Sequence, residues 1–219
     1  MKKLFLVVSL LSSFLAFGFT DEYIISTIDC YDAKYFLEEQ IYFKYDDEEN
    51  LYYLQKKDYF SSAWYVLTPE NLEILRANIK KALDWGKIAK ENKTSISKEL
   101  PDSQIKVSAI KEYHNEWYSS SRDITLTFNF LSVVEHSTVI CSLVIYGNQV
   151  PSLQNQYIDI EFEEVIFTND LIEYFYDSIS PETIEAAQKQ HEKQKEAERT
   201  SVEKLIEEAE HVEEEIFNH

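Results

Sequence analysis

Apolar and polar residues alternate in several short stretches of the chain, as they do in strands that bury one face. Residues 41–45 and 51–55 are two such stretches, and the acidic turn 46–50 separates them, so together they predict a hairpin. Residues 60–67 predict a third strand. Because consecutive strands with short connections pair antiparallel, we expect this part of the chain to begin an antiparallel sheet.

The apolar period changes to three and four residues after Thr68-Pro69-Glu70, a sequence that favours a helix start. Thr68 can accept a hydrogen bond from a free amide of the first turn, Pro69 suits the first helical position, and Glu70 suits the positive end of the helix dipole. An apolar stripe follows at Leu72, Leu75, Ile79, Ala82, Leu83, Gly86 and Ala89. We therefore predict an amphipathic helix of about six turns.

Strand-like alternation returns in the second half of the chain, at 124–130, 139–145 and 158–162. The order of strands, one long helix and more strands is typical of an α+β fold. We predict a mainly antiparallel sheet of about six or seven strands with one long amphipathic helix packed on it, followed by a charged C-terminal helical tail.

The tail, residues 181–219, differs in composition from the part that precedes it. It contains 12 Asp and Glu residues against 5 Lys and Arg residues. Apolar residues recur there at alternating spacings of three and four, the a/d pattern of a coiled coil, over about two heptads. They are Val202, Leu205, Ala209, Val212 and Ile216. We expect the tail to contact a partner protein or to mediate self-association.

The first residues have the pattern of a secretory signal peptide. Lys2 and Lys3 precede an apolar run over residues 4–19, and the small residues Ala16 and Gly18 suit cleavage near its end. The alternative is a retained anchor, but a spanning helix needs about 20 apolar residues and this run is shorter. The predicted organisation is a signal peptide (1–20), an α+β globular domain (21–180) and an acidic helical tail (181–219). We expect a periplasmic or extracellular protein with no stable membrane span after cleavage.

The net charge narrows the possible partners. The chain carries a formal charge of −19, and removal of Lys2 and Lys3 with the signal peptide takes it to −21. Nucleic acids and anionic membrane surfaces repel a protein of this charge, so we expect neither as a partner.

The two cysteines, Cys30 and Cys141, allow two interpretations. In an oxidising compartment an even number of cysteines favours a disulfide, and this is the pairing that we predict. The alternative is two separate core thiols, because free cysteine behaves as a small hydrophobic residue.

Candidate catalytic groups are sparse, and the sequence identifies no catalytic residue. The five histidines are scattered without the spacing of a helical zinc motif. With Gly18, Gly86 and Gly147 as its glycines, the chain has no glycine-rich phosphate loop. The acidic turn 46–49 lacks the spaced ligands and glycine of a calcium loop, which favours a solvated hairpin tip. We therefore expect no metal and no cofactor.

Two further features could mark a site. Glu164 occupies a position where the alternation of 158–162 predicts an apolar residue, so it marks a bulge or strand end, or else a buried carboxylate. Trp117 and Tyr118 precede a serine-rich stretch and are the best candidates for surface aromatic residues that bind a ligand.

From the whole sequence we expect a non-enzymatic exported protein. The alternative is a hydrolase-like enzyme whose site is built from dispersed carboxylates and His114 or His136.

Overall fold

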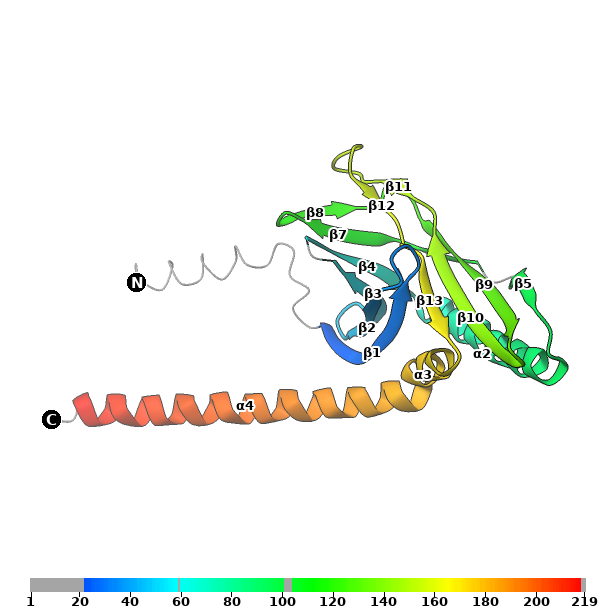
Figure 1. The fold of residues 1–219 in the computed structure, drawn as a ribbon. Coiled ribbons are helices and arrows are strands. Elements are labelled where there is room, and N and C mark those ends of the chain that lie inside the picture. The colour runs from blue at the N-terminus through cyan, green and yellow to red at the C-terminus, as the bar shows by residue number, and fades with distance from the viewer. Residues whose placement is uncertain (1–21, 59, 101–103, 218–219) are drawn as a thin grey trace.

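The computed structural model describes residues 22–58, 60–100 and 104–217, and for residues 205–217 it describes the backbone alone. The predicted signal peptide, residues 1–20, lies outside the described residues. The described chain is an α+β body from which one long helix extends (Figure 1).

An antiparallel sheet of 11 strands forms most of the body, in the order β5-β9-β10-β13-β1-β2-β3-β4-β7-β8 with β6 paired to β9. Its strands are β1 (Glu22–Asp32), β2 (Glu38–Asp46), β3 (Leu51–Lys57), β4 (Ser61–Leu67), β5 (Ile96–Glu99), β6 (Ile105–Val107), β7 (Ala109–Tyr113), β8 (Glu116–Ser119), β9 (Ile124–Glu135), β10 (Thr138–Gly147) and β13 (Val165–Thr168). A separate pair consists of β11 (Val150–Pro151) and β12 (Asp159–Ile160).

The prediction of an α+β fold with an antiparallel sheet is confirmed, and the predicted number of six or seven strands is wrong. Four of the missed strands, β5 to β8, lie in 96–119 and have three to five residues each. Strands this short contain too few alternations to be recognised from their pattern. β1 was missed because partly buried residues dominate its first half, so no sharp contrast between two faces develops there.

The two halves of the sheet are connected a second time through the adjacent strands β6 and β7. Only Ser108 separates β6 from β7, yet β6 pairs with β9 and β7 pairs with β4. The backbone N–H of Val66 also donates to the carbonyl of Ser108 at 2.9 Å. The segment β6–β7 therefore links the half of the sheet that contains β9 and β10 to the half that contains β3 and β4.

Helix α2 (Pro69–Asn92) confirms the predicted amphipathic helix. Thr68 Oγ1 accepts the N–H of Asn71 at 3.2 Å, and Lys93 ends the helix in the left-handed conformation with φ 49°. The buried side of α2 packs on β9, β10 and β6. There the indole of Trp85 meets Phe130 edge-on, with ring centroids 5.8 Å apart.

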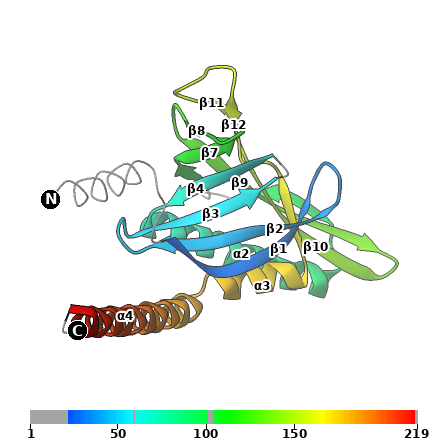
Figure 2. The same ribbon diagram turned by 90° about the vertical axis from the view of Figure 1, so that its left-hand side faces the viewer.

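Two further helices follow the last strand of the sheet. Helix α3 (Asp170–Ser178) contacts α2 and packs on β1 and β13, so the two helices lie on the same side of the sheet (Figure 2). Helix α4 (Pro181–Phe217) is 37 residues long and runs far past the strands (Figure 1). In the described part of the chain, no helix combines the length and the apolar character needed to cross a membrane.

Candidate functional site

An open polar cleft of about 790 Å³ lies beside the β1–β2 loop. Residues from four parts of the chain line it: the β1–β2 loop and the start of β2 (32–35, 37 and 39), Asp58 after β3, the end of β10 at Tyr146 and Gly147, and residues 161–164 between β12 and β13. Its lining is strongly acidic. The carboxylates belong to Asp32, Glu39, Asp58, Glu161, Glu163 and Glu164.

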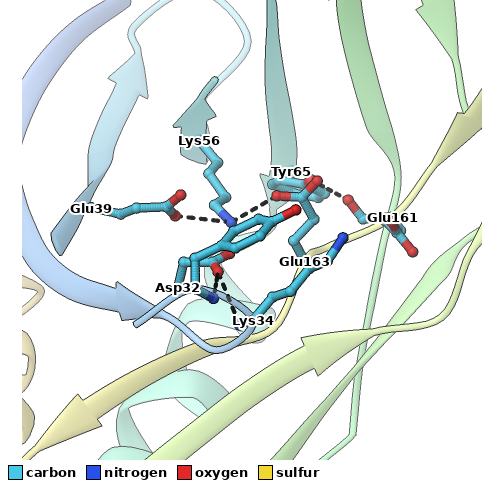
Figure 3. A network of polar contacts seen from close by, with 8 residues as sticks. Asp32, Lys34, Glu39, Lys56, Tyr65, Glu161 and Glu163 are labelled. Carbon is cyan, nitrogen blue, oxygen red and sulfur yellow. Dashed lines mark hydrogen bonds and ion pairs between the residues drawn. The ribbon is translucent and has the colours of Figure 1, made fainter. Parts of the chain in front are cut away.

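Lys56 fastens two of these carboxylates to β3. Its side chain is only 6% exposed, and its Nζ lies 3.0 Å from Glu39 Oε2 and 2.9 Å from Glu163 Oε2 (Figure 3). Burial lowers the pKa of the Lys56 ammonium, but the hydrogen bonds and charges of Glu163 and Glu39 outweigh it, so the pKa lies above its ordinary value. The ammonium therefore stays charged and holds the two acidic segments together.

The side chain of Tyr65 in β4 holds the backbone of residues 161–162 in place. The buried phenol donates a hydrogen bond of 2.5 Å to the carbonyl oxygen of Glu161 (Figure 3). Its ring meets Phe162 edge-on, with ring centroids 4.7 Å apart. Burial raises the pKa of Tyr65, so the phenol stays protonated and remains a donor. The N–H of Gly147 donates to the carbonyl of Phe162 at 2.8 Å from the other side. These contacts leave the side chain of Glu161 exposed at the cleft.

The β1–β2 loop forms the rim of the cleft and is held by Asp32. The carboxylate of Asp32 accepts the N–H groups of Lys34 and Tyr35 at 2.9 and 2.7 Å, and its carbonyl accepts the N–H of Phe36 at 2.9 Å. Phe36 has a φ of 52°, a region that bulky residues rarely occupy. The result is a tight loop whose apolar side chains point outward.

The predicted aromatic site at Trp117 and Tyr118 lies elsewhere, in a strand of the sheet. Both residues belong to the edge strand β8, because the chain turns back earlier, at His114 and Asn115 with positive φ. Trp117 packs against Trp64 with ring centroids 5.1 Å apart. Tyr118 is buried in the core, and its hydroxyl donates to Glu116. Little of Tyr118 is therefore exposed at the surface, while Trp117 is half-buried.

The structure does not show the predicted disulfide: Cys30 and Cys141 are both buried free thiols. They belong to β1 and β10, and β13 lies between these two strands. Two strand spacings amount to about 10 Å, whereas the Cα atoms of a disulfide lie at most about 7 Å apart. Burial raises the pKa of the Cys30 thiol to about 12. The alternative of two separate core thiols describes this arrangement.

The histidines considered for a hydrolase site are not brought to the cleft. His114 lies in the β7–β8 turn beside Tyr113, with ring centroids 4.1 Å apart. His136 is in the β9–β10 turn, with a side chain 94% exposed. Neither is among the described residues that line the acidic cleft. The described carboxylates therefore have no histidine partner there for acid–base chemistry.

The structure shows the surroundings of two acidic features that the sequence singled out. At the hairpin tip, the carboxylate of Asp46 accepts the N–H groups of Glu48 and Glu49 at 2.9 and 3.0 Å. Glu164 is exposed in the irregular segment before β13, which agrees with a strand end rather than a buried carboxylate. Across the residues described, no group of three His, Cys, Asp or Glu side chains could hold a metal ion.

Sequence reasoning missed the cleft, although one signal pointed to it. Lys56 follows Tyr52 and Leu54 on the same face of β3, so the alternation places an ammonium where an apolar side chain is expected. Its partners Glu39 and Glu163 are far away in the sequence and could not be identified from spacing. Comparison of the chain with protein-family models, with curated proteins and with solved structures finds no match.

Proposed function

We propose that this chain is an exported, non-enzymatic scaffolding protein that binds through its α+β body and self-associates through its C-terminal helix. Export rests on the signal-peptide pattern of residues 1–20. The observation that best supports a scaffolding role is the division of α4 into a part fastened to the body and a part that extends past it.

The fastened part of α4 ends at Lys195. His191 stacks on Tyr23 of β1, and Lys195 Nζ lies 3.1 Å from Asp47 Oδ2 in the β2–β3 turn. Beyond this point the side chains of residues 196–204 of α4 are exposed. The helix then continues to Phe217, a further length of about 30 Å at 1.5 Å per residue (Figure 1).

A single helix that extends into solvent is marginal by itself, because most helical stability in proteins comes from packing of an apolar face. The three-and-four spacing that begins at Val202 provides such a face in the sequence of the extending stretch. Val202, at the start of that stretch, is 54% exposed. A second copy of the same helix would supply the missing packing.

Charge determines the conditions under which two copies should associate. Residues 201–217 contain seven glutamates and one lysine, so two such helices repel each other near neutral pH. Salt screens this repulsion between exposed charges. We therefore expect the apparent size of the chain in light scattering to increase with added salt and with protein concentration.

The same experiment distinguishes a different kind of partner. If the helix served a cationic partner instead, binding would weaken as salt increased, and the isolated chain would remain a monomer at every salt concentration. A monomer throughout the salt series would therefore contradict self-association.

A further inference from the structure

We propose that the acidic cleft and the β1–β2 loop together form a docking surface for a cationic peptide segment that also carries an apolar residue. This inference rests on the proposed binding role of the body, and it identifies the surface and the chemistry of the partner.

The apolar half of the surface is the loop tip. Tyr35, Phe36 and Leu37 are consecutive and are 64%, 73% and 63% exposed, and the loop that carries them stands out from the sheet (Figure 2). Three large apolar side chains at one tip are an unusual concentration for a protein surface, and exposed apolar patches commonly mark interaction sites. Tyr35 and Leu37 also line the cleft, so the apolar tip and the acidic surface are continuous.

Hydrogen bonds hold the loop in the conformation that exposes these side chains. Asp32 accepts two backbone N–H groups and so closes the turn, and the N–H of Ala33 donates to the carbonyl of Glu164 at 3.1 Å. Phe36 adopts a positive φ, where asparagine or glycine is the common choice. These contacts hold the backbone that carries Phe36 at the tip of the loop.

The acidic half of the surface determines the sign of the charge that a partner must carry. Among the described residues that line the cleft, six are acidic and Lys34 is the one basic side chain. Lys56 lies behind them and pairs with Glu39 and Glu163. The Glu163 side chain is still 52% exposed, so it can accept hydrogen bonds from a second cation. Charge complementarity therefore favours a partner with lysine or arginine side chains and disfavours an acidic one.

The two halves together define one occupant. A peptide with basic residues can satisfy the carboxylates of 161–164, while an adjacent apolar residue covers the tip at Phe36. A purely cationic ligand would leave the tip exposed to water, and a purely apolar ligand would bury carboxylates without a partner, which is costly. A cationic peptide with an apolar residue avoids both costs.

The test begins with a displayed library of random short peptides, selected against the chain without residues 1–20. The enriched peptides should combine Lys or Arg with an aliphatic or aromatic residue. A synthetic copy of the leading peptide is then titrated into the chain and its variants by calorimetry. Absence of enrichment, or enrichment of neutral or acidic peptides, would overturn the proposal.

Two variants separate the apolar half from the acidic half. Phe36→Asn removes the phenyl ring while keeping a residue suited to positive φ, and we expect it to weaken peptide binding about tenfold. Glu161→Gln combined with Glu164→Gln should weaken binding about fivefold, and should reduce its salt dependence. Equal affinity for the unmodified chain and for Phe36→Asn would contradict the proposal.

Matched controls come from the β9–β10 hairpin. Val133 is 57% exposed and Glu135 has a side chain 62% exposed, so Val133→Thr and Glu135→Gln alter comparable groups away from the cleft. We expect both to leave peptide binding unchanged; equal losses there would indicate non-specific attraction to an acidic protein and would overturn the proposal. Sedimentation of the same samples tests self-association separately, so failure of one proposal is not mistaken for failure of the other.

Discussion

His191 of α4 stacks on Tyr23 of β1, with ring centroids 4.0 Å apart and 18° between the ring planes. The same histidine places its Nε2 3.5 Å from Asp47 Oδ2, and Lys195 approaches that carboxylate one helical turn later. Burial and the charge of Asp47 raise the pKa of Tyr23, so this phenol stays neutral beneath the helix. The contact joins α4 to both the first strand and the β2–β3 turn.

Replacement of His191 by alanine should loosen this attachment. A stacked ring pair contributes about 0.5–1.5 kcal/mol beyond its buried area, so we expect amide hydrogens of 181–195 to exchange several times faster in His191→Ala. Hydrogen exchange followed by mass spectrometry measures this directly. Lys189→Ala is the matched control, because Lys189 pairs with Glu185 on the exposed side of the same helix. Equal exchange in the two variants would show that the stack does not hold the helix.

The glycines of α2 and β10 should respond oppositely to an added methyl group. At Gly147, a Cβ would lie 2.7 Å from Ile124 Cγ2 and 2.8 Å from Phe162 Cβ, so Gly147→Ala should lower the free energy of unfolding by about 1–3 kcal/mol. At Gly86 the nearest atom, Cys141 Sγ, would be at an ordinary 3.6 Å. Gly86→Ala should therefore be neutral, or stabilising by up to about 1 kcal/mol through helix propensity. Urea denaturation of both variants measures the difference, and similar losses would contradict this packing.

Stability should decrease at alkaline pH. Burial raises the pKa of Cys30 from 9.0 to about 12 and that of Tyr53 from 10.0 to about 12. Above about pH 9 the unfolded chain releases these protons while the folded chain retains them, so the free energy of unfolding falls as pH rises toward 12. The stability that these groups contribute is fully present below pH 9. Urea midpoints between pH 7 and 11 test this, and Tyr53→Phe should show a shallower decline. A midpoint that stays constant up to pH 11 would contradict the prediction.

The N-terminal cap of α2 makes a separate contribution. Thr68→Ala removes the oxygen that accepts the N–H of Asn71, and we expect it to lower the free energy of unfolding by about 1 kcal/mol. Thr68→Ser keeps the hydroxyl and should retain most of the stability. Thermal or urea unfolding of the two variants provides the comparison. If both lost the same free energy, the hydroxyl would not be responsible.

The sequence predicted the elements whose pattern is long and local. The start of α2 could be placed because Thr68 and Pro69 each have a positional preference that acts within one turn. The strands around Phe128 and Leu143 were recognisable because their alternation continues through most of β9 and β10. A short strand such as β6 forms because it pairs with a strand that is distant in the sequence. Such pairing leaves no pattern of apolar and polar residues in the strand's own sequence.

The cleft depends on contacts of the same distant kind. Lys56 and Glu163 are 107 positions apart, and the bond between them exists because the sheet brings β3 close to the segment before β13. The exposure of Phe36 could not be predicted either, because a single phenylalanine in a sequence is normally expected to be buried in a core. The strand that contains Trp117 and Tyr118 was not predicted either, because it has only four residues and follows a two-residue turn at His114 and Asn115.

Sedimentation equilibrium of two chains, both without residues 1–20, tests the central claim most directly. One continues to His219, and the other ends at Arg199. The shorter chain keeps the attachments at His191 and Lys195 but lacks the apolar residues that recur from Val202 to Ile216. We predict that the longer chain, in salt sufficient to screen its carboxylates, has a mass that rises with concentration toward that of an oligomer, while the shorter chain remains a monomer. A monomer mass for both chains at all concentrations would contradict self-association through α4.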